Sequence, residues 1–303
     1  MNIKTRISIG ITAYNESQNI RKLLLSLLNQ RCISIFISEI LIVSSGSTDG
    51  TNRLVSGLSK KYPKLKLIRQ KKRLGKASAV NVILSKAKEN IIVLCSADLV
   101  LAEKTLDKLI LPFGNKKVGI VGSHPIPLND QKTFFGYAAH LLWNLHHTIS
   151  LSSPKMGECI AFRKTFKQIP VLSAVDEVNI ESLIKGQGYK AVYAPNAIVY
   201  NKGAGTLSDF IARRRHIYAG HLATKYEYSY SVSTINGVKI FFILLNKIQP
   251  TPRFIFWTPI IVLLEVYSRF LGFLDYKYKL KTHTIWQITK STKKLTHLGK
   301  LNV

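Results

Sequence analysis

Three short polar stretches, each directly after an apolar run, contain residues of this chain that could carry out chemistry. They are residues 14–16 (YNE), 44–48 (SSGST) and 96–98 (SAD). The second lies in the segment IVSSGSTDGT, where an apolar strand leads into a turn of small and hydroxyl residues and then into a helix pattern. A phosphate or a nucleotide commonly binds at such a strand end. Ser44 and Ser45 stand there where an acidic pair would be expected to hold a ribose or a base.

Alternating apolar runs and helical patterns in the first two-thirds of the chain predict the scaffold that positions these stretches. The patterns predict strands at residues 7–11, 40–43, 65–68, 91–94 and 118–121, and helices at residues 20–28, 52–59, 77–87 and 104–111. This order implies an α/β fold with a mainly parallel sheet flanked by helices. Because ligands of such sheets bind at the carboxyl ends of the strands, the three polar stretches are expected to meet in one cleft.

The composition limits the classes of partner. A chain of 303 residues with 46% hydrophobic residues can form one large domain, or one domain with an appendage. Its 44 Lys and Arg residues against 16 Asp and Glu residues give a net charge of +28, which favours nucleotides, anionic lipids or nucleic acid. The sequence contains no recognised nucleic-acid-binding module, so no nucleic-acid partner is expected.

The cysteines and the N-terminus indicate the compartment. Cys32, Cys95 and Cys159 lie far apart in the sequence without metal-ligand spacing, and they are predicted to be free thiols in a reducing environment. The N-terminal residues are too polar for a signal peptide. The catalytic part is therefore expected to face the cytoplasm.

The chain changes character near residue 231, which divides it into a predicted catalytic domain (residues 1–230) and a C-terminal part (residues 231–303). Residues 254–274 form an apolar segment about as long as a membrane span, although Glu265 and Arg269 within it are costly in lipid. The tail beyond Asp275 carries seven Lys or Arg residues and no acid. A basic tail beside an apolar helix fits an anionic membrane surface, so membrane association is predicted, either as a span or as an interfacial helix.

Seven motifs in order resemble those of the family-two glycosyltransferases, which have the Rossmann-like GT-A fold. They are ISIGITAYNES (7–17), SSGSTDGT (44–51), LGKASAVN (74–81), LCSADLV (94–100), GECIAFRKTF (157–166), VDEVNIESLIKGQGYKAVYAPNAIVY (175–200) and RRRHIYAGH (213–221). The resemblance covers roughly residues 4–222. It implies an inverting enzyme that transfers a sugar from a nucleotide-diphosphate sugar to an acceptor, with Mg²⁺ or Mn²⁺ as cofactor.

The resemblance also implies a set of donor-binding residues. The expected metal ligand is Asp98, the surviving carboxylate of a DxD-like motif in which Ser96 replaces the first acid. The other expected donor contacts are Ala13, Asn15, Glu16, Ser44, Ser45, Lys76, Asn81, Ala97, Arg214 and Arg215. Serines at positions 44 and 45 are expected to alter base selection without abolishing catalysis. Three consecutive arginines cannot share one face of a helix, so at least one of them is expected to point away from the donor.

On the acceptor side, the resemblance implies a general base and a binding strand. An inverting transferase needs a base to take the proton of the acceptor hydroxyl. Glu177 matches the family's base by its distance from Gly188, and Asp176 is the second candidate because the order of the acidic pair is reversed. Gly157 and Glu158 are expected to lie beside the acceptor, which is expected to be a lipid-linked or cell-surface glycan.

A second hypothesis is a non-catalytic nucleotide- or glycan-binding subunit with the same fold. It rests on the serines that replace acids at positions 44, 45 and 96. Retention of Asp98, Glu177 and the basic helix favours the enzyme.

Overall fold

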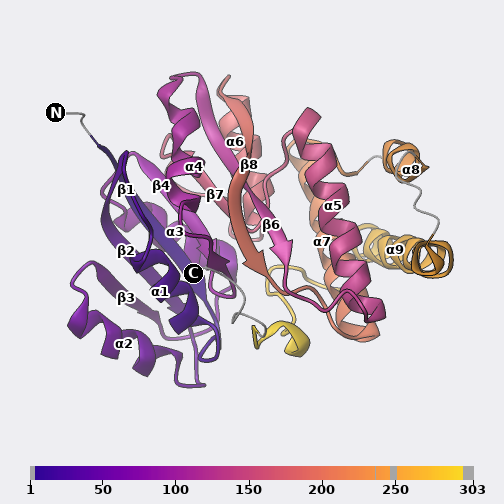
Figure 1. Cartoon of the computed structure of the whole chain (residues 1–303), viewed down its shortest axis with the longest axis horizontal. Helices are drawn as coiled ribbons and strands as arrows, with labels where there is room; N and C mark the ends of the chain where they lie inside the picture. Colours follow the sequence, from indigo (N-terminus) through magenta and orange to yellow (C-terminus); the bar gives the residue numbers. More distant parts are fainter. Residues whose placement is uncertain (1–3, 236, 246–250, 296–303) are drawn as a thin grey trace.

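The structure, a computed structural model, describes residues 4–235, 237–245 and 251–295. Its sheet has the strand order β3-β2-β1-β4-β7-β6-β8-β5 (Figure 1). The strands are β1 (Thr5–Ala13), β2 (Ile35–Ser45), β3 (Leu65–Gln70), β4 (Ile91–Ser96), β5 (Val100–Leu101), β6 (Val118–Pro127), β7 (Cys159–Arg163) and β8 (Lys190–Asn201). Strands β3, β2, β1 and β4 pair in parallel, as do β6 and β8, whereas β7 runs antiparallel between β4 and β6 and β5 runs antiparallel beside β8. The predicted mainly parallel sheet is confirmed.

Helices cover both faces of this sheet, which explains why its strands are apolar at nearly every position. On one face, Ile40 and Ile42 of β2 pack with α1 (Ile20–Leu28), α2 (Thr51–Lys61) and α4 (Thr105–Ile110). On the other face, Leu41 and Val43 pack with α3 (Lys76–Lys86) and α6 (Asp176–Gly186). A short 3-10 helix, η1 (Leu111–Gly114), follows α4. Burial on two sides fixes the register of β2, since a slip by one residue would exchange the two faces.

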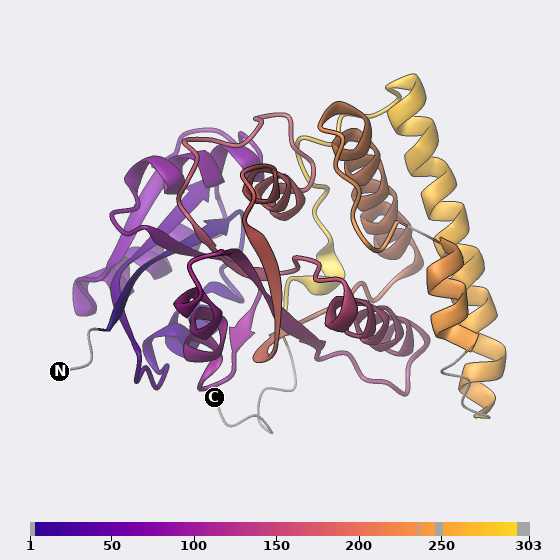
Figure 2. The ribbon, with the colours of Figure 1, turned by 90° about the horizontal axis from the view of Figure 1, so that it is seen from above.

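A second group of helices stands beside the sheet and carries the C-terminal part of the chain. It contains α5 (Phe134–Ser152), α7 (Leu207–Glu227), α8 (Gly237–Leu245) and α9 (Pro252–Tyr278). Helix α9 packs along α7, as Figure 2 shows. Arg214 of α7 donates two hydrogen bonds of 2.6 Å to Glu265 of α9, and Arg215 forms an ion pair with Asp275. The domain boundary at residue 231 stays a prediction, although these contacts join the two parts.

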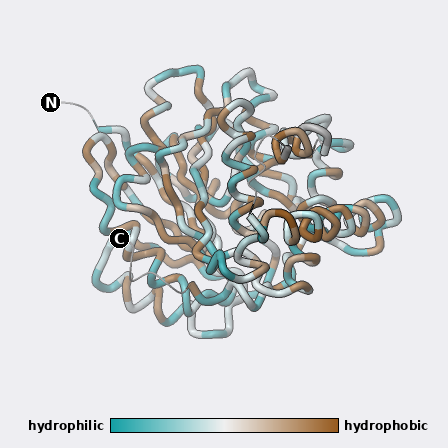
Figure 3. Tube along the Cα trace, turned by 45° about the vertical axis from the view of Figure 1, so that its right-hand side comes forward, coloured by the Kyte–Doolittle hydropathy of each residue, from teal (hydrophilic) through white to brown (hydrophobic). Residues whose placement is uncertain are grey.

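Helix α9 combines a charged side with an apolar side. Among the described residues it is the one helix long and apolar enough to cross a membrane, which alone is weak support for a span. Its acids face α7, while many of its apolar side chains are exposed, and Figure 3 shows this apolar stretch at the edge of the molecule. The exposed side chains are Ile255, Phe256, Ile260, Val262, Leu263, Val266, Tyr267, Phe270 and Phe273, with Phe241 and Phe242 of α8 beside them.

Beyond α9 the chain turns back across the molecule. Residues 284–295, which include the 3-10 helix η2 (Lys290–Thr292), cross the carboxyl ends of β1 and β4 and are named here the C-terminal strap (Figure 1). Leu295 and Thr292 of the strap are 1% and 4% exposed. The expectation that the basic tail lies on a membrane surface is therefore corrected for this part, because its own hydrogen bonds hold it in the cleft.

Replacing Arg215 with Met tests whether the contacts between α7 and α9 hold the C-terminal part in place. The side chain of Asp275 is fully buried, so Arg215→Met leaves its carboxylate with His283 as the remaining partner. An unpaired buried charge is costly, and we expect the free energy of unfolding to fall by about 3 kcal/mol in urea denaturation. The double variant Arg215→Met, Asp275→Asn should recover most of this loss; an equally unstable double variant would contradict the account.

Candidate active site

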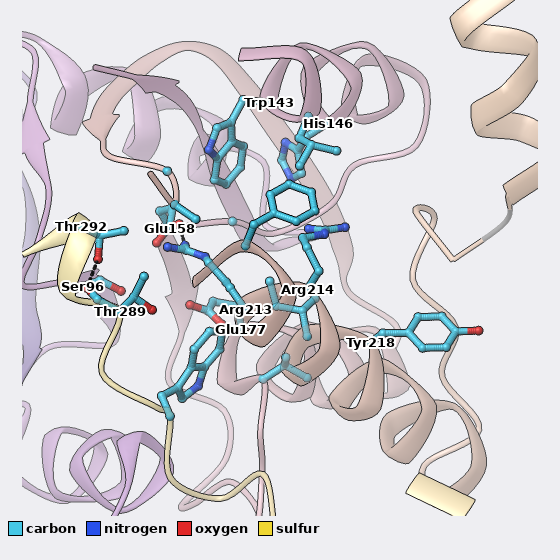
Figure 4. Close-up of a pocket in the computed structure, with 18 of the residues that line it drawn as sticks. Ser96, Trp143, His146, Glu158, Glu177, Arg213, Arg214, Tyr218, Thr289 and Thr292 are labelled. Carbon is cyan, nitrogen blue, oxygen red and sulfur yellow. Dashed lines mark hydrogen bonds and ion pairs between the residues drawn. The ribbon is translucent and has the colours of Figure 1, made fainter. Parts of the chain in front are cut away.

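A cavity of about 550 Å³ lies between the carboxyl ends of β1 and β4 and the helices α5, α6, α7, α8 and α9. Figure 4 shows its two sides: Trp143 and His146 project into it from α5, and Arg213 and Arg214 project from α7. One end is polar and lies against the sheet, and the other end is apolar and lies between α5, α8 and α9. A pocket of this size with few convergent polar groups is typical of a small-molecule site.

The structure brings most of the predicted site residues to this pocket. Those that line it are Ala13, Glu16, Ser45, Lys76, Ser96, Ala97, Asp98, Gly157, Glu158, Glu177 and Arg214. They come from all seven motifs. The expectation of one shared cleft at the carboxyl edge of the sheet therefore agrees with the geometry.

Asn15 and Ser44 do not line the pocket, because their side chains contact residues of the turn after β2 instead. Asn15 adopts a left-handed backbone with φ of 52°, and its side-chain oxygen accepts a 2.8 Å hydrogen bond from the backbone N–H of Thr48. The Ser44 hydroxyl lies 2.9 Å from that of Ser47. Ser45 reaches the pocket wall while accepting a 3.1 Å hydrogen bond from the backbone N–H of Leu74. The structure thus places only one of the two serines where a donor could contact it.

Asn81, Arg215 and Asp176 also lie outside the pocket lining. The amide of Asn81 donates to the carbonyl of Ile169 at 3.0 Å and accepts from its N–H at 2.8 Å, so this side chain fixes the loop before α6. Arg215 points to Asp275 instead, and it is Arg213, two residues earlier, that lines the pocket and donates a 2.6 Å hydrogen bond to Glu158. For Asn81 and Arg215 the structure thus differs from the expectation that they contact the donor, and Asp176, the second candidate base, does not line the pocket.

Three carboxylates share the polar end: Glu16, Asp98 and Glu158. Burial, and then the charge of Asp98, raise the pKa of Glu16 to about 7. Burial also raises the pKa of Glu158, with Arg213 opposing and Asp98 adding to the rise. Asp98 itself makes no hydrogen bond or ion pair with any described residue. The polar end therefore holds an unpaired carboxylate close to two others.

The residues present fit a divalent metal shared with a phosphate ligand. Mg²⁺ is commonly bound through one or two carboxylates plus substrate phosphates, without a full set of protein ligands. Asp98 offers such a carboxylate, whereas no group of three or more His, Cys, Asp or Glu side chains that could hold a metal exists in the part of the chain that the structure describes. Glu16 and Glu158 are committed to cations, so Asp98 is the residue that remains for a metal.

Lys76 joins the two candidate bases. Its ammonium lies 3.1 Å from Asp176 and 2.6 Å from Glu177 at the start of α6. Burial and the charge of Glu177 raise the pKa of Asp176 to about 7. Burial also pushes the pKa of Glu177 upward, but the charge and hydrogen bond of Lys76 outweigh it and hold this pKa below its usual value. Only Glu177 lines the pocket, and Asp176 lies beneath it with 1% exposure.

The C-terminal strap adds residues to the donor end that local sequence patterns did not indicate. Lys293 forms an ion pair with Glu16 and donates a 3.1 Å hydrogen bond to the carbonyl of Tyr14. The backbone N–H of Leu295 donates to Asn19 at 3.0 Å. Arg73 contacts the carbonyl of Trp286, and its guanidinium stacks 3.9 Å from the centre of the Tyr14 ring. Lys293 and Glu16 are 277 positions apart, so no periodicity or motif could join them.

On the opposite side of the cleft, the strap is held by the loop before α6 and by α7. The indole N–H of Trp286 donates to the carbonyl of Ala174 at 3.0 Å, and its ring lies 3.9 Å from that of His216. The backbone N–H of Ser291 donates to Asp209 at 3.1 Å. Gly75, with φ of +87°, passes so close that a Cβ there would lie 2.7 Å from the carbonyl of Thr284. The strap thus covers the polar end of the pocket.

The chain is similar to known glycosyltransferases in sequence and in fold. The family model of glycosyl transferase family 2 matches residues 8–168, more than half of the chain. The chain is 31% identical over 131 residues to a beta-monoglucosyldiacylglycerol synthase of Nostoc sp., which covers 43% of this chain and 28% of that protein. It is 27% identical over 198 residues to a dolichol-phosphate mannosyltransferase of Pyrococcus furiosus, which covers 63% of this chain and 55% of that protein. The chain thus spans about a quarter to a half of the length of these relatives.

The structure resembles that of a mannosyltransferase from Pyrobaculum calidifontis in complex with GDP-Man and Mn²⁺. The TM-score is 0.64 at 19% identity, covering 92% of this chain and 89% of that one. Fold and sequence together define the GT-A fold that the motifs predicted. The protein belongs to glycosyl transferase family 2. The roles of its individual site residues stay predictions.

Replacing Lys293 tests whether the strap takes part in donor binding. Lys293→Met leaves Glu16 without its cationic partner beside Asp98, so negative potential increases where a diphosphate would bind. We expect the Kd of a nucleoside diphosphate in the presence of Mn²⁺ to increase about 10-fold in isothermal titration. The neighbouring Lys294 is exposed, and Lys294→Met serves as the control. Equal Kd values for the two variants would show that the strap only covers the site.

Proposed function

We propose that this protein is an inverting glycosyltransferase that moves a sugar from a nucleotide-diphosphate sugar to a lipid-linked or cell-surface glycan acceptor. The observation that carries the proposal is the unpaired carboxylate of Asp98 in the same pocket as Glu177, with Lys76 and Arg213 beside them. A metal-binding acid, a candidate base and cations for a leaving diphosphate are the groups that such a transfer requires.

At the donor end, the chain's own residues bind and orient the nucleotide sugar. Ala13, Glu16 and Ser45 line the side on which the nucleoside is expected, and Ser96 and Ala97 continue that wall toward Asp98. A Mg²⁺ or Mn²⁺ ion held by Asp98 would neutralise the diphosphate as it leaves. Arg213 adds positive charge to this end, whereas Arg214 is paired with Glu265. The complex of GDP-Man and Mn²⁺ with a protein of similar fold supports this arrangement.

At the reacting centre, Glu177 takes the proton of the acceptor hydroxyl. The acceptor oxygen forms a bond to the anomeric carbon from the face opposite the diphosphate, while the bond from that carbon to the diphosphate oxygen breaks, which inverts the configuration. Lys76 holds Glu177 ionised in the donor-free protein. A bound diphosphate competes for Lys76, and a weaker contact with Lys76 raises the basicity of Glu177. Asp176 beneath it adds a second charge that depends on pH.

The acceptor end supports a partner at a membrane surface. The pocket becomes apolar between α5, α8 and α9, and the outer sides of α8 and α9 expose a band of aromatic and aliphatic side chains. Because Glu265 and Asp275 of α9 pair with α7, the helix fits an interfacial position along the domain better than a span leading away from it. The names of two relatives, a beta-monoglucosyldiacylglycerol synthase and a dolichol-phosphate mannosyltransferase, agree with a lipid acceptor. We propose a cytoplasmic, membrane-associated enzyme.

A non-catalytic, nucleotide- or glycan-binding subunit is the second candidate function. The hydroxyl groups at positions 44, 45 and 96 favour it, because they supply no charge to a donor site. Nucleotide binding without any sugar transfer or hydrolysis would identify the protein as such a subunit.

Replacing Asp98 with Asn tests the metal site with a neutral side chain of the same size. For the unaltered protein, a thermal-shift panel of UDP, GDP and their sugars should show one nucleotide whose stabilisation requires Mn²⁺. Asp98→Asn should abolish this dependence, because it removes the unpaired carboxylate. Asp130→Asn, at an exposed loop position outside the pocket, is the control. Metal-dependent stabilisation that survives in Asp98→Asn would exclude the assigned role.

Replacing the two acids of α6 separately distinguishes the base from its neighbour. Glu177→Gln should lower kcat by 10²- to 10⁴-fold, as expected for loss of a general base. With the pKa of Asp176 near 7, its carboxylate is protonated below and charged above this pH, so kcat/KM of the unaltered enzyme should rise as the pH increases from 6 to 8. Asp176→Asn should keep activity but lose most of this rise. If Asp176→Asn abolishes turnover and Glu177→Gln does not, the roles are reversed.

A further inference from the structure

A lysine without a partner lies in the middle of the pocket. Lys155, in the loop between α5 and β7, is half-buried and lines the cavity, yet its ammonium makes no hydrogen bond or ion pair with any described residue. Burial, and then the charge of Arg214, lower the pKa of Lys155 to about 8. The side chain is therefore still mainly charged at pH 7. A buried ammonium group without a partner is costly, so an anion bound beside it would stabilise it.

A histidine beside it also lacks a hydrogen-bond partner. His146 of α5 is 8% exposed, and neither ring nitrogen makes a well-formed hydrogen bond, although the backbone of Met156 lies near. Figure 4 shows its ring projecting into the pocket, where the edge-on Trp143 ring at 5.1 Å holds it. Burial and the charge of Lys155 lower the pKa of His146, so the ring is neutral and keeps one N–H donor. Buried donors of this kind are usually satisfied.

The charges around Lys155 leave a positive excess. Arg214 and Arg269 share the single carboxylate of Glu265. Two further acids act on Lys155: Glu177, which is paired with Lys76, and Glu181, which accepts a 2.6 Å hydrogen bond from Tyr230 and whose pKa is raised by burial. At the polar end, by contrast, Lys76, Arg213 and Lys293 are each paired with a carboxylate. The middle of the pocket is thus the part that can accept an additional negative group.

Beyond Lys155 the pocket continues as an apolar groove. Its walls are formed by Leu142 and Ile149 of α5, Ile240 and Leu244 of α8, and Ile261 and Val262 of α9. Phe241 and Val266 line the groove and are also 56% and 59% exposed. The groove therefore opens directly onto the exposed apolar band of α8 and α9. A hydrocarbon chain that enters from a lipid surface would therefore contact apolar side chains of all three helices.

We propose that Lys155 and His146 bind the phosphate of a long-chain lipid phosphate and that the groove between α5, α8 and α9 holds its hydrocarbon chain. This inference rests on the proposed function, since the lipid carries the acceptor glycan. The order of groups in the pocket matches the order in a glycan linked to such a lipid: the chain at the apolar end, the phosphate in the middle, and the sugar whose hydroxyl reacts beside Glu177. An uncharged glycolipid would leave Lys155 unpaired, and a soluble glycan would leave the groove empty.

Isothermal titration of the full chain in detergent tests the site directly. The probes are farnesyl phosphate, farnesol and inorganic phosphate, each added in the presence and absence of the nucleoside diphosphate and Mn²⁺. We expect farnesyl phosphate to bind at least 10-fold more tightly than either of the other two. Lys155→Met should increase the Kd of farnesyl phosphate by roughly 10- to 100-fold, because a charge-assisted hydrogen bond is lost. Lys155→Arg should largely restore binding, and Lys167→Met, at an exposed lysine outside the pocket, should change nothing.

The outcomes separate this inference from the proposed function. If farnesol binds as tightly as farnesyl phosphate, or if Lys155→Met has no effect, the phosphate site is refuted. If inorganic phosphate binds as tightly as farnesyl phosphate, the groove does not hold a chain, and the proposal fails in that part. In each of these cases, metal-dependent nucleotide binding and sugar transfer would still support the proposed function. Absence of nucleotide binding would refute the proposed function itself, whatever the lipid result.

Discussion

The arrangement of this protein depends on the ion pairs between α7 and α9. Arg214 with Glu265 and Arg215 with Asp275 attach an apolar helix to the catalytic domain and leave its opposite side exposed. The same contacts set the direction in which the chain leaves α9, so that the C-terminal strap returns over the carboxyl ends of β1 and β4. Charged groups within an apolar helix, which are costly in lipid, are here the groups that join it to protein.

The pocket follows from this attachment. Its polar wall comes from the sheet and from motifs in the first two-thirds of the chain, whereas its apolar wall and its cover come from α8, α9 and the strap. Opposite charges are paired almost throughout the polar end, which lets several acids and bases share a small volume. Among the described residues, Asp98 at this end and Lys155 in the middle of the pocket have neither a hydrogen bond nor an ion pair, and they mark the places where a metal and an anionic ligand are proposed to bind.

The fold and the polar half of the pocket could be predicted from the sequence, because both depend on local patterns. Apolar periodicity located α1 at Ile20–Leu28, and strand ends located Glu16 and Asp98. Contacts that depend on tertiary geometry could not be predicted from the sequence. Successive residues of a helix point about 100° apart, so three adjacent arginines must point in different directions. Which of them faces the pocket depends on packing, and the structure shows that Arg213 does. Lys293 could not be found, since a bond between residues 277 positions apart has no local signal.

The position of the strap has a consequence for biosynthesis. Every residue of the sheet and of α7 leaves the ribosome before α9, and the strap follows α9. A chain that is still being synthesised therefore has its acidic donor end open and Glu16 without Lys293. An unfinished chain thus has no complete donor site, because Lys293 is added after every other residue of the polar end.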